Sequence, residues 1–401
     1  MKAMISAEAG AQVAGPPAGT GYAVCFGDGS ERVIGEGPPL FRVRVSDEAA
    51  LRQLWETDAY TAATGFLRGE FEIEGDLVAA VGWHCARPRP TLPQRIYAAL
   101  AKLDPARLES LFQSRSRAAA NVRFHYDRSN EFFRQFLDSR MVYSCAYFKD
   151  PNWSIEEAQF AKLEHICRKL DLKPGERLLD VGCGWGGLLF HAAGRYGVHA
   201  TGCTLSRKQF EYAGERARAF AGRVEIREID YRDLSGQFDK IVSVGMFEHV
   251  GRRRMPGYFR KISSLLADDG LFLNHGITRP QPVTDDAQTL FLRRKVFPGG
   301  ELPHLGDLIR DAENAGFEVL DVENLRPHYA LTTRAWLKRL QENRAECLRL
   351  AGEETYRTWL LYLAGSAFNF EQKQTEVHQM LLAKRCGGRR RHLTREYMYR
   401  S

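Results

Sequence analysis

The chain of 401 residues lacks any run of 18 or more apolar residues, so no segment is expected to span a bilayer. It also lacks internal repeats and long low-complexity tracts, which argues against repeat and fibrous architectures. The opening stretch up to residue 20 is rich in Ala, Gly and Pro and has one lysine but no sustained apolar core. This composition predicts a disordered lead rather than a secretory signal.

None of the eight cysteines forms a Cys-x-x-Cys pair, so neither a zinc site nor a disulfide framework is indicated, and no metal is expected. Free thiols are typical of a reducing cytoplasm, where we expect the protein. The formal net charge of +7 favours anionic partners such as lipid headgroups, nucleic acid or acidic substrates. An ordinary basic surface is the alternative explanation.

Composition and turn signals divide the chain. The segments 41–45 and 71–74 alternate apolar and polar residues and are separated by turn signals, which predicts a small α+β module. A Pro- and Arg-rich stretch at 86–95 is typical of a linker. The predicted organisation is a disordered lead at 1–20, a small N-terminal module at 21–90, a linker at 91–120, a catalytic domain at 121–384 and a basic tail at 385–401.

Strand and helix patterns alternate through the catalytic domain. Strands are expected at 177–182, 198–202, 224–228, 240–244 and 270–275, and helices at 187–196, 206–221 and 258–267. This alternation predicts an α/β fold with a parallel sheet covered by helices on both faces. In such sheets the ligand lies at the carboxyl ends of the strands. The stretch 334–384 is expected to be mostly helical and to pack outside the sheet.

A glycine-rich loop, Asp180-Val-Gly-Cys-Gly-Trp-Gly-Gly187, joins the first of these strands to its helix. Its glycines permit a tight turn and a close approach of a ligand to the backbone. Dinucleotide-binding loops are followed by an acidic residue at the end of the next strand, whereas this next strand ends in Thr201-Gly-Cys-Thr-Leu-Ser206. The loop is therefore a poor match to a nicotinamide site and is similar to the first motif of class I methyltransferases.

Several further motifs, in a fixed order, carry a more specific resemblance. They are Phe124-His-Tyr-Asp-Arg-Ser-Asn130, Met141-Val-Tyr-Ser-Cys-Ala-Tyr-Phe148, Thr204-Leu-Ser-Arg-Lys-Gln209, Asp230-Tyr-Arg-Asp-Leu234, Val244-Gly-Met-Phe-Glu-His-Val-Gly251, Asn274-His-Gly-Ile-Thr278, Phe297-Pro-Gly-Gly300 and His328-Tyr329. Together with the glycine loop, they resemble the cyclopropane fatty acid synthase family, which includes the mycolic acid cyclopropane synthases. The module at 21–90 resembles the family's N-terminal domain, which helps to engage lipid.

The resemblance implies a fold, a reaction and a set of functional residues. The fold is a Rossmann-like class I methyltransferase sheet, and the reaction is methylene transfer from S-adenosylmethionine to a cis double bond in a membrane phospholipid, forming a cyclopropane ring. The expected cofactor-binding residues are Tyr143, Ser144, Asp180, Gly182, Gly184, Gly186, Thr204, Leu205, Gln209, Asp230 and Tyr231. The expected ligands of a catalytic bicarbonate ion are Cys145, Glu248, His275, the backbone of Ile277, and Tyr329.

The expected chemistry explains why such groups are needed. An alkene is a weak nucleophile and must be aligned with the methyl donor in a dry cavity. Closing the ring then requires a base beside a carbocation that water would quench. Bicarbonate can serve as this base if His275 and Tyr329 donate to its oxygens and Glu248 accepts from its hydroxyl.

Each of these residues also has a purely structural interpretation. Cys145 is equally typical of a small buried core residue. Glu248 can cap the following helix, while His275 and Tyr329 can simply pack in the core. His249 is interpreted as structural.

The resemblance further implies peripheral contact with the inner face of a membrane, and family members are often dimeric. The arginines at 252–254 and the basic tail can meet anionic headgroups, although solvated surface is an equal explanation. Phe291, Val296 and Phe297 can line an acyl channel or pack in the core. The chain departs from many family members at Lys295 and Leu331, which leaves the substrate details open.

Three alternative functions remain. The first is a related alkene methyltransferase that produces methyl-branched or methylene fatty acids. The second is a small-molecule N-methyltransferase, which would need neither the bicarbonate set nor the module at 21–90. The third is a non-enzymatic lipid- or nucleic-acid-binding protein. The intact glycine loop and Cys/Glu/His/Tyr set argue against this last possibility, and no nucleic-acid partner is expected.

Overall fold

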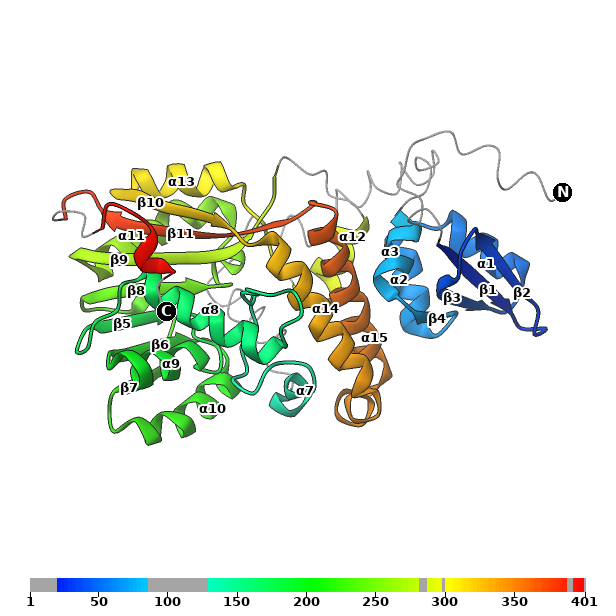
Figure 1. Cartoon of the computed structure of the whole chain (residues 1–401), viewed down its shortest axis with the longest axis horizontal. Helices are drawn as coiled ribbons and strands as arrows, with labels where there is room; N and C mark the ends of the chain where they lie inside the picture. Colours follow the sequence, from blue (N-terminus) through cyan, green and yellow to red (C-terminus); the bar gives the residue numbers. More distant parts are fainter. Residues whose placement is uncertain (1–19, 86–128, 281–286, 298–299, 388–391, 400–401) are drawn as a thin grey trace.

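The computed structural model describes residues 20–85, 129–280, 287–297, 300–387 and 392–399. Nearly all of the predicted lead and the whole predicted linker lie outside these residues. Figure 1 shows a small α/β unit at the N-terminal end, a larger α/β unit at the other end, and two long helices between them. None of the described helices combines the length and the apolar composition needed to cross a membrane.

The N-terminal unit is a four-stranded sheet with three helices. The elements are β1 (Gly21–Phe26), β2 (Glu31–Gly35), β3 (Pro39–Val45), α1 (Glu48–Glu56), α2 (Ala59–Arg68), β4 (Glu72–Gly75) and α3 (Leu77–Cys85), and the strand order is β2-β1-β3-β4. Strand β3 alternates buried Phe41, Val43 and Val45 with exposed arginines, as the period of two predicts. The expected small α+β arrangement is therefore present.

The larger sheet has seven strands in the order β10-β11-β9-β8-β5-β6-β7. They are β5 (Arg177–Val181), β6 (His199–Thr204), β7 (Val224–Glu228), β8 (Phe238–Val244), β9 (Leu266–Thr278), β10 (Phe317–Asn324) and β11 (Glu376–Lys384). Strands β5 to β9 run parallel to one another. All five expected strands are present, and the predicted α/β fold is confirmed.

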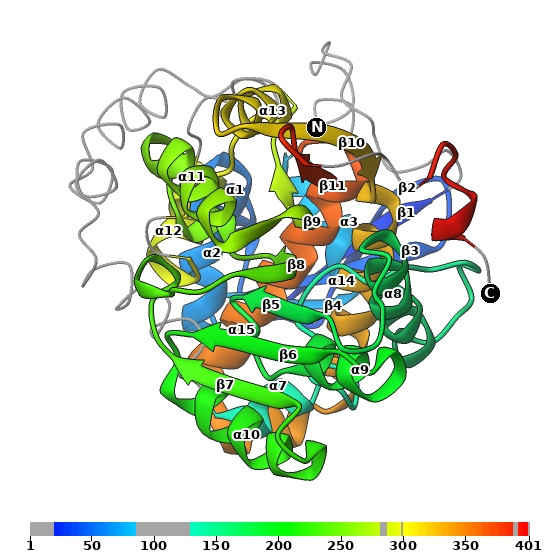
Figure 2. The same cartoon turned by 90° about the vertical axis from the view of Figure 1, so that its left-hand side faces the viewer.

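Helices cover both faces of this sheet, as Figure 2 shows. They are α8 (Ile155–Lys169), α9 (Gly187–Tyr196), α10 (Arg207–Ala217), α11 (Met255–Leu265) and α13 (Leu305–Asn314). Neighbouring residues of β5 point to opposite faces: Leu178 packs in a core with α8 and α9, and Leu179 packs in a core with α11 and α13. Residues 178–181 of β5 are all buried because helices cover both faces of the sheet there.

A third core joins the two units. It is formed mainly by α7 (Asn130–Arg134), α12 (Ala287–Lys295), α14 (Arg326–Glu342) and α15 (Arg344–Glu371). The ring centroid of Trp359 lies 5.8 Å from that of Phe132 and 5.4 Å from that of Phe133. Phe66 and Leu77 of the N-terminal unit belong to the same core, so the long helices hold the small sheet against the large one.

Two expectations about the sheet are wrong. The stretch 334–384 is mostly helical as expected, but it does not all pack outside the sheet, because β11 at its end lies between β9 and β10. The sheet is consequently mixed rather than parallel, since β11 is antiparallel to both neighbours. Met, Leu, Ala and Gln in this segment favour helix intrinsically, but burial between two strands overrides that preference.

Arg357 on α15 links the two units and supplies a test of this packing. Its guanidinium donates to the Phe66 carbonyl over 3.0 Å and pairs with Glu72, and its side chain is 9% exposed. We expect Arg357→Met to lower the free energy of unfolding by about 1–3 kcal/mol, because the buried Phe66 carbonyl loses its donor. Arg349 on the same helix is 68% exposed and pairs only with Glu346 among the described residues, so Arg349→Met should cost under about 0.5 kcal/mol. Equal losses in denaturant unfolding would contradict this role.

Candidate active site

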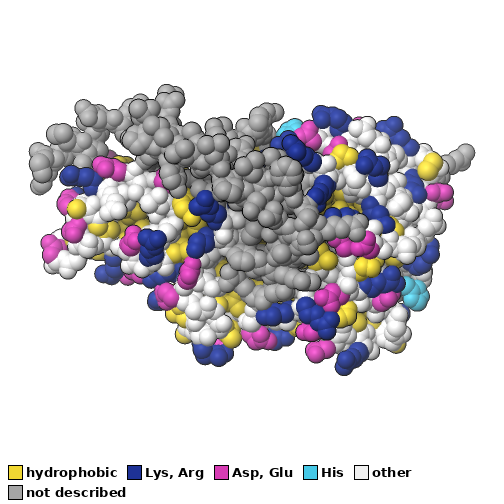
Figure 3. All heavy atoms as spheres, turned by 180° about the vertical axis from the view of Figure 1, so that it is seen from behind, with side chains coloured by type: hydrophobic (Ala, Val, Ile, Leu, Met, Phe, Trp, Pro, Cys, Tyr) yellow, Lys and Arg dark blue, Asp and Glu magenta, His cyan; other side chains and the backbone are white. Residues whose placement is uncertain are grey.

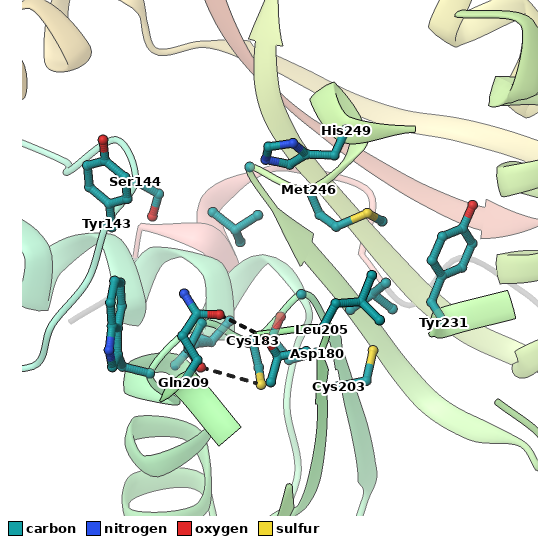
Figure 4. A pocket seen from close by; sticks show the side chains of 18 of the residues that line it. Tyr143, Ser144, Asp180, Cys183, Cys203, Leu205, Gln209, Tyr231, Met246 and His249 are labelled. Carbon is teal, nitrogen blue, oxygen red and sulfur yellow. Dashed lines mark hydrogen bonds between the residues drawn. The ribbon is translucent and has the colours of Figure 1, made fainter. Parts of the chain in front are cut away.

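A cavity of about 160 Å³ opens at the carboxyl ends of β5, β6 and β8 (Figure 4). Of the eleven expected cofactor-binding residues, ten line it. They are Tyr143, Ser144, Asp180, Gly182, Gly184, Thr204, Leu205, Gln209, Asp230 and Tyr231. Gly186 is the exception, because a Cβ there would lie 2.6 Å from the Phe190 ring. It begins α9 with a φ of +84° and so serves the turn rather than the cavity wall.

The glycine loop reaches the cavity through backbone geometry that only glycine adopts readily. Gly182 and Gly184 have φ values of +85° and +54°. A Cβ on Gly182 would stand 2.8 Å from Cγ of Met246, a residue that also lines the cavity. The amides of Gly182 and Cys183 both donate to the Cys203 carbonyl on β6, over 3.1 and 3.0 Å. The loop is therefore fixed against the neighbouring strand and leaves the cavity open.

Polar side chains at the end of β6 are oriented by one another. The Thr204 hydroxyl donates to Gln209 Oε1 over 2.8 Å, and the Ser206 amide donates to the Thr204 hydroxyl over 3.2 Å. Ser206 also caps α10 by accepting from the Gln209 amide. Because Oε1 of Gln209 is engaged with Thr204, its amide nitrogen remains available to the cavity.

The far end of the cavity is bordered by the segment after β7. Both carboxylate oxygens of Asp230 accept from the Arg232 guanidinium, at 2.8 and 2.5 Å. Tyr231 packs edge-on against the buried Tyr258, with ring centroids 5.6 Å apart. The carboxylate of Asp230 is thus committed to Arg232, while its backbone segment forms the wall.

The five residues expected at the reacting centre come from four segments that a series of contacts links. Glu248 Oε1 accepts from the Ile277 amide over 2.8 Å, and His275 lies two residues earlier on β9. Ile277 pairs across the sheet with Val377, whose carbonyl accepts from the Leu325 amide. The Leu325 carbonyl in turn accepts from the Tyr329 amide over 3.1 Å and lies 3.8 Å from the Cys145 thiol.

Glu248 has the most unusual environment of the five. Its Oε2 is buried and has no hydrogen-bond partner among the described residues. Burial raises the pKa of the Glu248 carboxyl to about 7, and the hydrogen bond from Ile277 only partly opposes this shift. The Ile277 amide, expected as a ligand of the bicarbonate ion, instead donates to Glu248 in this structure and so orients its carboxylate.

His275 is 2% exposed, and burial holds its pKa well below the usual value, so the ring is neutral. Its Nδ1 lies 3.1 Å from the amide nitrogen of Gln379, the residue directly opposite on β11. Nε2 of His275 is thereby left as the ring nitrogen for other contacts. Oε1 of Gln379 is buried without a partner among the described residues.

Cys145 and Tyr329 are both buried, and each has a packing role of its own. The Cys145 thiol donates to the Ala146 carbonyl over 3.2 Å, and burial raises its pKa. Tyr329 stacks on Phe370, with ring centroids 4.5 Å apart, and packs edge-on against Trp336. Cys145 and Tyr329 therefore both have a structural role in the core, which does not exclude a functional one.

Four residues near these groups were missed or misassigned in the sequence analysis. Lys162 on α8, Met246 and His249 line the cavity, and Gln379 contacts His275. His249 was interpreted as structural, but it faces the cavity, and burial lowers its pKa to about 4. The available signal for Gln379 was its place beside the apolar run of β11, whereas Lys162 lies in a helix with several other charged residues and gave no such signal.

The raised pKa of Glu248 makes stability depend on pH. Between about pH 4.5 and 7 the folded protein keeps a proton that the unfolded chain has released, so stability falls as pH rises through this window. Glu248→Gln removes the effect. Relative to the parent, it should gain about 2–3 kcal/mol in unfolding free energy between pH 5 and pH 8. Urea unfolding in bicarbonate-free buffer measures this, and a constant difference would refute the pKa shift.

Gly182 offers a test of the loop geometry with a matched control. In Gly182→Ala the new methyl displaces Met246 into the cavity, so affinity for S-adenosylhomocysteine, the demethylated form of the expected cofactor, should fall at least about tenfold. Gly175 has nearly the same φ, +82°, but no described atom lies within 4 Å of its Cβ position. Gly175→Ala should therefore lower stability by about 1–2 kcal/mol while leaving affinity unchanged. Calorimetric titration distinguishes the two, and equal affinities would contradict the assignment.

Comparisons with known proteins identify the family to which the chain belongs. Residues 113–380 match the family model described as mycolic acid cyclopropane synthetase. A probable fatty acid methyltransferase from Pseudomonas putida is 39% identical over 383 residues, covering 93% of this chain and 95% of that protein. Cyclopropane mycolic acid synthase 2 from Mycobacterium bovis is 39% identical over 287 residues, covering 66% of this chain and 94% of its own length.

A solved structure extends the likeness to the fold. The mycolic acid cyclopropane synthase CmaA1, complexed with SAH and CTAB, superposes with a TM-score of 0.64 and 36% identity, covering 66% of this chain and 98% of that one. The resemblance drawn from the motifs is thus confirmed by sequence and by fold. The chain belongs to the mycolic acid cyclopropane synthase family of methyltransferases.

Proposed function

We propose that the protein transfers a methylene group from S-adenosylmethionine to the cis double bond of an unsaturated acyl chain in a membrane phospholipid, closing a cyclopropane ring. One observation carries the proposal: a carboxylate oxygen of Glu248 is buried without a partner among the described residues, in a segment whose Met246 and His249 line the cofactor cavity. Unpartnered buried carboxylates are costly, and they are typical of sites that receive a ligand or a proton.

The cavity walls suit S-adenosylmethionine. Gly182 and Gly184 expose backbone to the amino-acid part of the cofactor, and the amide nitrogen of Gln209 is available to the ribose. Tyr143 covers the cavity from the side of α14 and α15, with its ring centroid 5.2 Å from that of Trp336. When bound, the cofactor supplies an electrophilic methyl group on a sulfonium. The surrounding aromatic core keeps this region dry.

The polar groups around Glu248 suit a bicarbonate ion. Glu248 Oε2 can accept a hydrogen bond from a hydroxyl, and Nε2 of neutral His275 can donate to an oxygen once Gln379 has engaged Nδ1. When bound there, bicarbonate supplies an oxygen base close to the cofactor. Ile277 orients Glu248, while Cys145 and Tyr329 complete the wall. These residues would hold and receive the proton lost in ring closure.

The phospholipid acceptor is supported by the N-terminal unit. The Pseudomonas relative, named as a fatty acid methyltransferase, aligns over 93% of the chain, whereas the mycobacterial synthase aligns over 66%. An apolar cavity of about 100 Å³ lies between that unit and α15, lined by Phe66, Trp83, Phe291 and Leu361 among others. Such a cavity suits an acyl chain.

Contact with the membrane is proposed to be peripheral, at its cytoplasmic face, with the N-terminal unit as the docking element. Figure 3 shows Lys and Arg side chains interspersed with Asp and Glu, rather than one basic patch, on the face it displays. Arg252 pairs with Asp307, and Lys384 pairs with Asp268. The arginines at 389–391 lie outside the described residues. On this face, charge alone therefore does not mark a docking surface.

A second candidate is methyl transfer without ring closure. Lys295, one of the departures from the family pattern, pairs with Glu354 over 2.9 Å and so ties the end of α12 to α15. Its neighbours Val296 and Phe297 belong to the core around the proposed acyl channel. A changed channel shape would alter how the acyl chain meets the base.

Expression in a bacterium without its own cyclopropane synthase tests the proposal. Transfer of a methyl with loss of one proton adds CH₂, so fatty acid methyl esters should gain a species about 14 mass units heavier that resists mild hydrogenation. Glu248→Gln should remove this species because the base loses its partner. A product of the same mass that takes up hydrogen retains a double bond and would indicate methyl transfer without ring closure. A product about 16 units heavier would indicate methylation followed by reduction.

Cys145→Ser provides a further arm of the experiment, and it is also expected to remove the product. Gly175→Ala is the folding control and should retain it. If the strain that expresses the unmodified protein shows unchanged lipids, although the protein binds S-adenosylmethionine, a lipid acceptor in that host is refuted. A small-molecule acceptor would then be favoured.

A further inference from the structure

Lys162 is a buried cation in the wall of the cofactor cavity. It projects from α8, its residue is 2% exposed, and it lines the cavity together with Ser144 and Asp180. Its Nζ donates to the Ser144 hydroxyl over 3.0 Å, which is its one hydrogen bond within the described ranges. No described carboxylate lies within ion-pair distance. An ammonium has three hydrogens to donate, so two remain unsatisfied by protein.

Neighbouring groups do not supply the missing partners. The carboxylate of Asp138 accepts from the backbone amides of Val142 and Arg140, over 2.7 and 3.2 Å, and makes no hydrogen bond or ion pair with Lys162. Desolvation lowers the pKa of Lys162 to about 8, with Asp138 and Asp180 opposing the shift. A cation held so incompletely is costly unless an anion joins it.

Asp180 has the complementary deficiency. It ends β5 directly before the glycine loop, is 3% exposed, and its Oδ1 has no partner in the described part of the chain. Desolvation raises its pKa to about 7, and Lys162 only partly opposes this. Figure 4 shows Asp180 and Ser144 entering the cavity from different segments. The methionine end of the cavity therefore carries one positive and one negative group that are both short of partners.

We propose that Lys162, with the Ser144 hydroxyl, binds the carboxylate of the amino-acid part of S-adenosylmethionine, while Asp180 receives its ammonium group. Because Lys162 donates to Ser144 Oγ, the hydroxyl hydrogen of Ser144 is free to be donated onward. The two protein charges match the two charges that the amino acid carries on one carbon. This inference deepens the proposed function by assigning the determinant of cofactor orientation.

The orientation has a consequence for the reacting sulfonium. When the Lys162 ammonium binds the cofactor carboxylate, its positive charge is paired. That carboxylate is several bonds away from the sulfonium. Without that carboxylate, Lys162 would repel a cationic ligand in the same low-dielectric cavity. The site should therefore discriminate strongly against cofactor analogues that lack the carboxylate.

A ligand-truncation cycle tests the proposal by calorimetric titration, without any lipid. The ligands are S-adenosylmethionine, decarboxylated S-adenosylmethionine and 5′-methylthioadenosine, which lacks the whole amino-acid part. The parent should bind decarboxylated S-adenosylmethionine roughly 10- to 100-fold more weakly than the intact cofactor. In Lys162→Met the ratio of the two affinities should approach one. The intact cofactor loses the ion pair between its carboxylate and Lys162, and the decarboxylated cofactor no longer experiences repulsion from the Lys162 ammonium. Affinity for 5′-methylthioadenosine should stay within about twofold of the parent.

Two further variants keep the test decisive. Lys240 is equally buried but donates to the Leu170 carbonyl and is not part of the cavity wall, so Lys240→Met should leave the ligand ratio unchanged. If Lys162→Met does not fold, Ser144→Ala should still reduce the ratio several-fold, since it removes the second donor.

Other outcomes would overturn the assignment. An unchanged ratio in Lys162→Met, or an equal loss of affinity for all three ligands, would mean that Lys162 is structural. An unchanged ratio together with a lost effect of added bicarbonate would assign Lys162 to that ion instead. Absence of cofactor binding by the parent would refute the cofactor itself. The expected ratios without any lipid product would refute only the lipid acceptor.

Discussion

The close contact of the glycine loop with strand β6 is the constraint on which the cavity depends. Two consecutive loop amides share the Cys203 carbonyl, which draws the loop down onto the sheet. The opposite side of this contact requires Gly202, where a Cβ would lie 2.4 Å from Leu189 and 2.7 Å from the Cys183 sulfur. With side chains excluded on both sides, the backbone itself becomes the floor of the cavity. The side chains of the surrounding segments form the walls of the cavity.

Desolvation then sets the chemistry of the buried polar groups, of which Asp180 and Lys162 line the cavity. Glu248, Asp180, Lys162 and His275 all have pKa values displaced in the direction that disfavours charge. The same apolar core that keeps water from the acceptor thus also leaves polar groups short of partners. Such an arrangement is unfavourable for stability and favourable for binding a charged ligand, which restores the missing interactions.

Much of this arrangement follows from local sequence. Consecutive apolar residues such as Leu178 and Leu179 predict a strand buried on both faces, and the glycine spacing predicts the loop at its end. The cofactor cavity was predictable because its residues follow successive parallel strands. The sequence could not show that Gly186, unlike Gly182 and Gly184, does not line the cavity, because this difference depends on the packing of Phe190 against Gly186. His249 was misassigned because nothing local tells a core histidine from one facing a cavity.

Strand β11 explains why the remainder of the site was not predictable. Its residues favour helix locally, and only the open edge of β9 makes a strand the better state. Once inserted, the strand performs two tasks at a distance in sequence. Gln379 meets His275 directly across the ladder, and the Val377 carbonyl anchors Leu325 at the start of α14, which carries Tyr329. The contacts among the residues of the proposed reacting centre therefore form only when the C-terminal part of the chain closes the sheet. This long-range dependence couples completion of the fold to completion of the site.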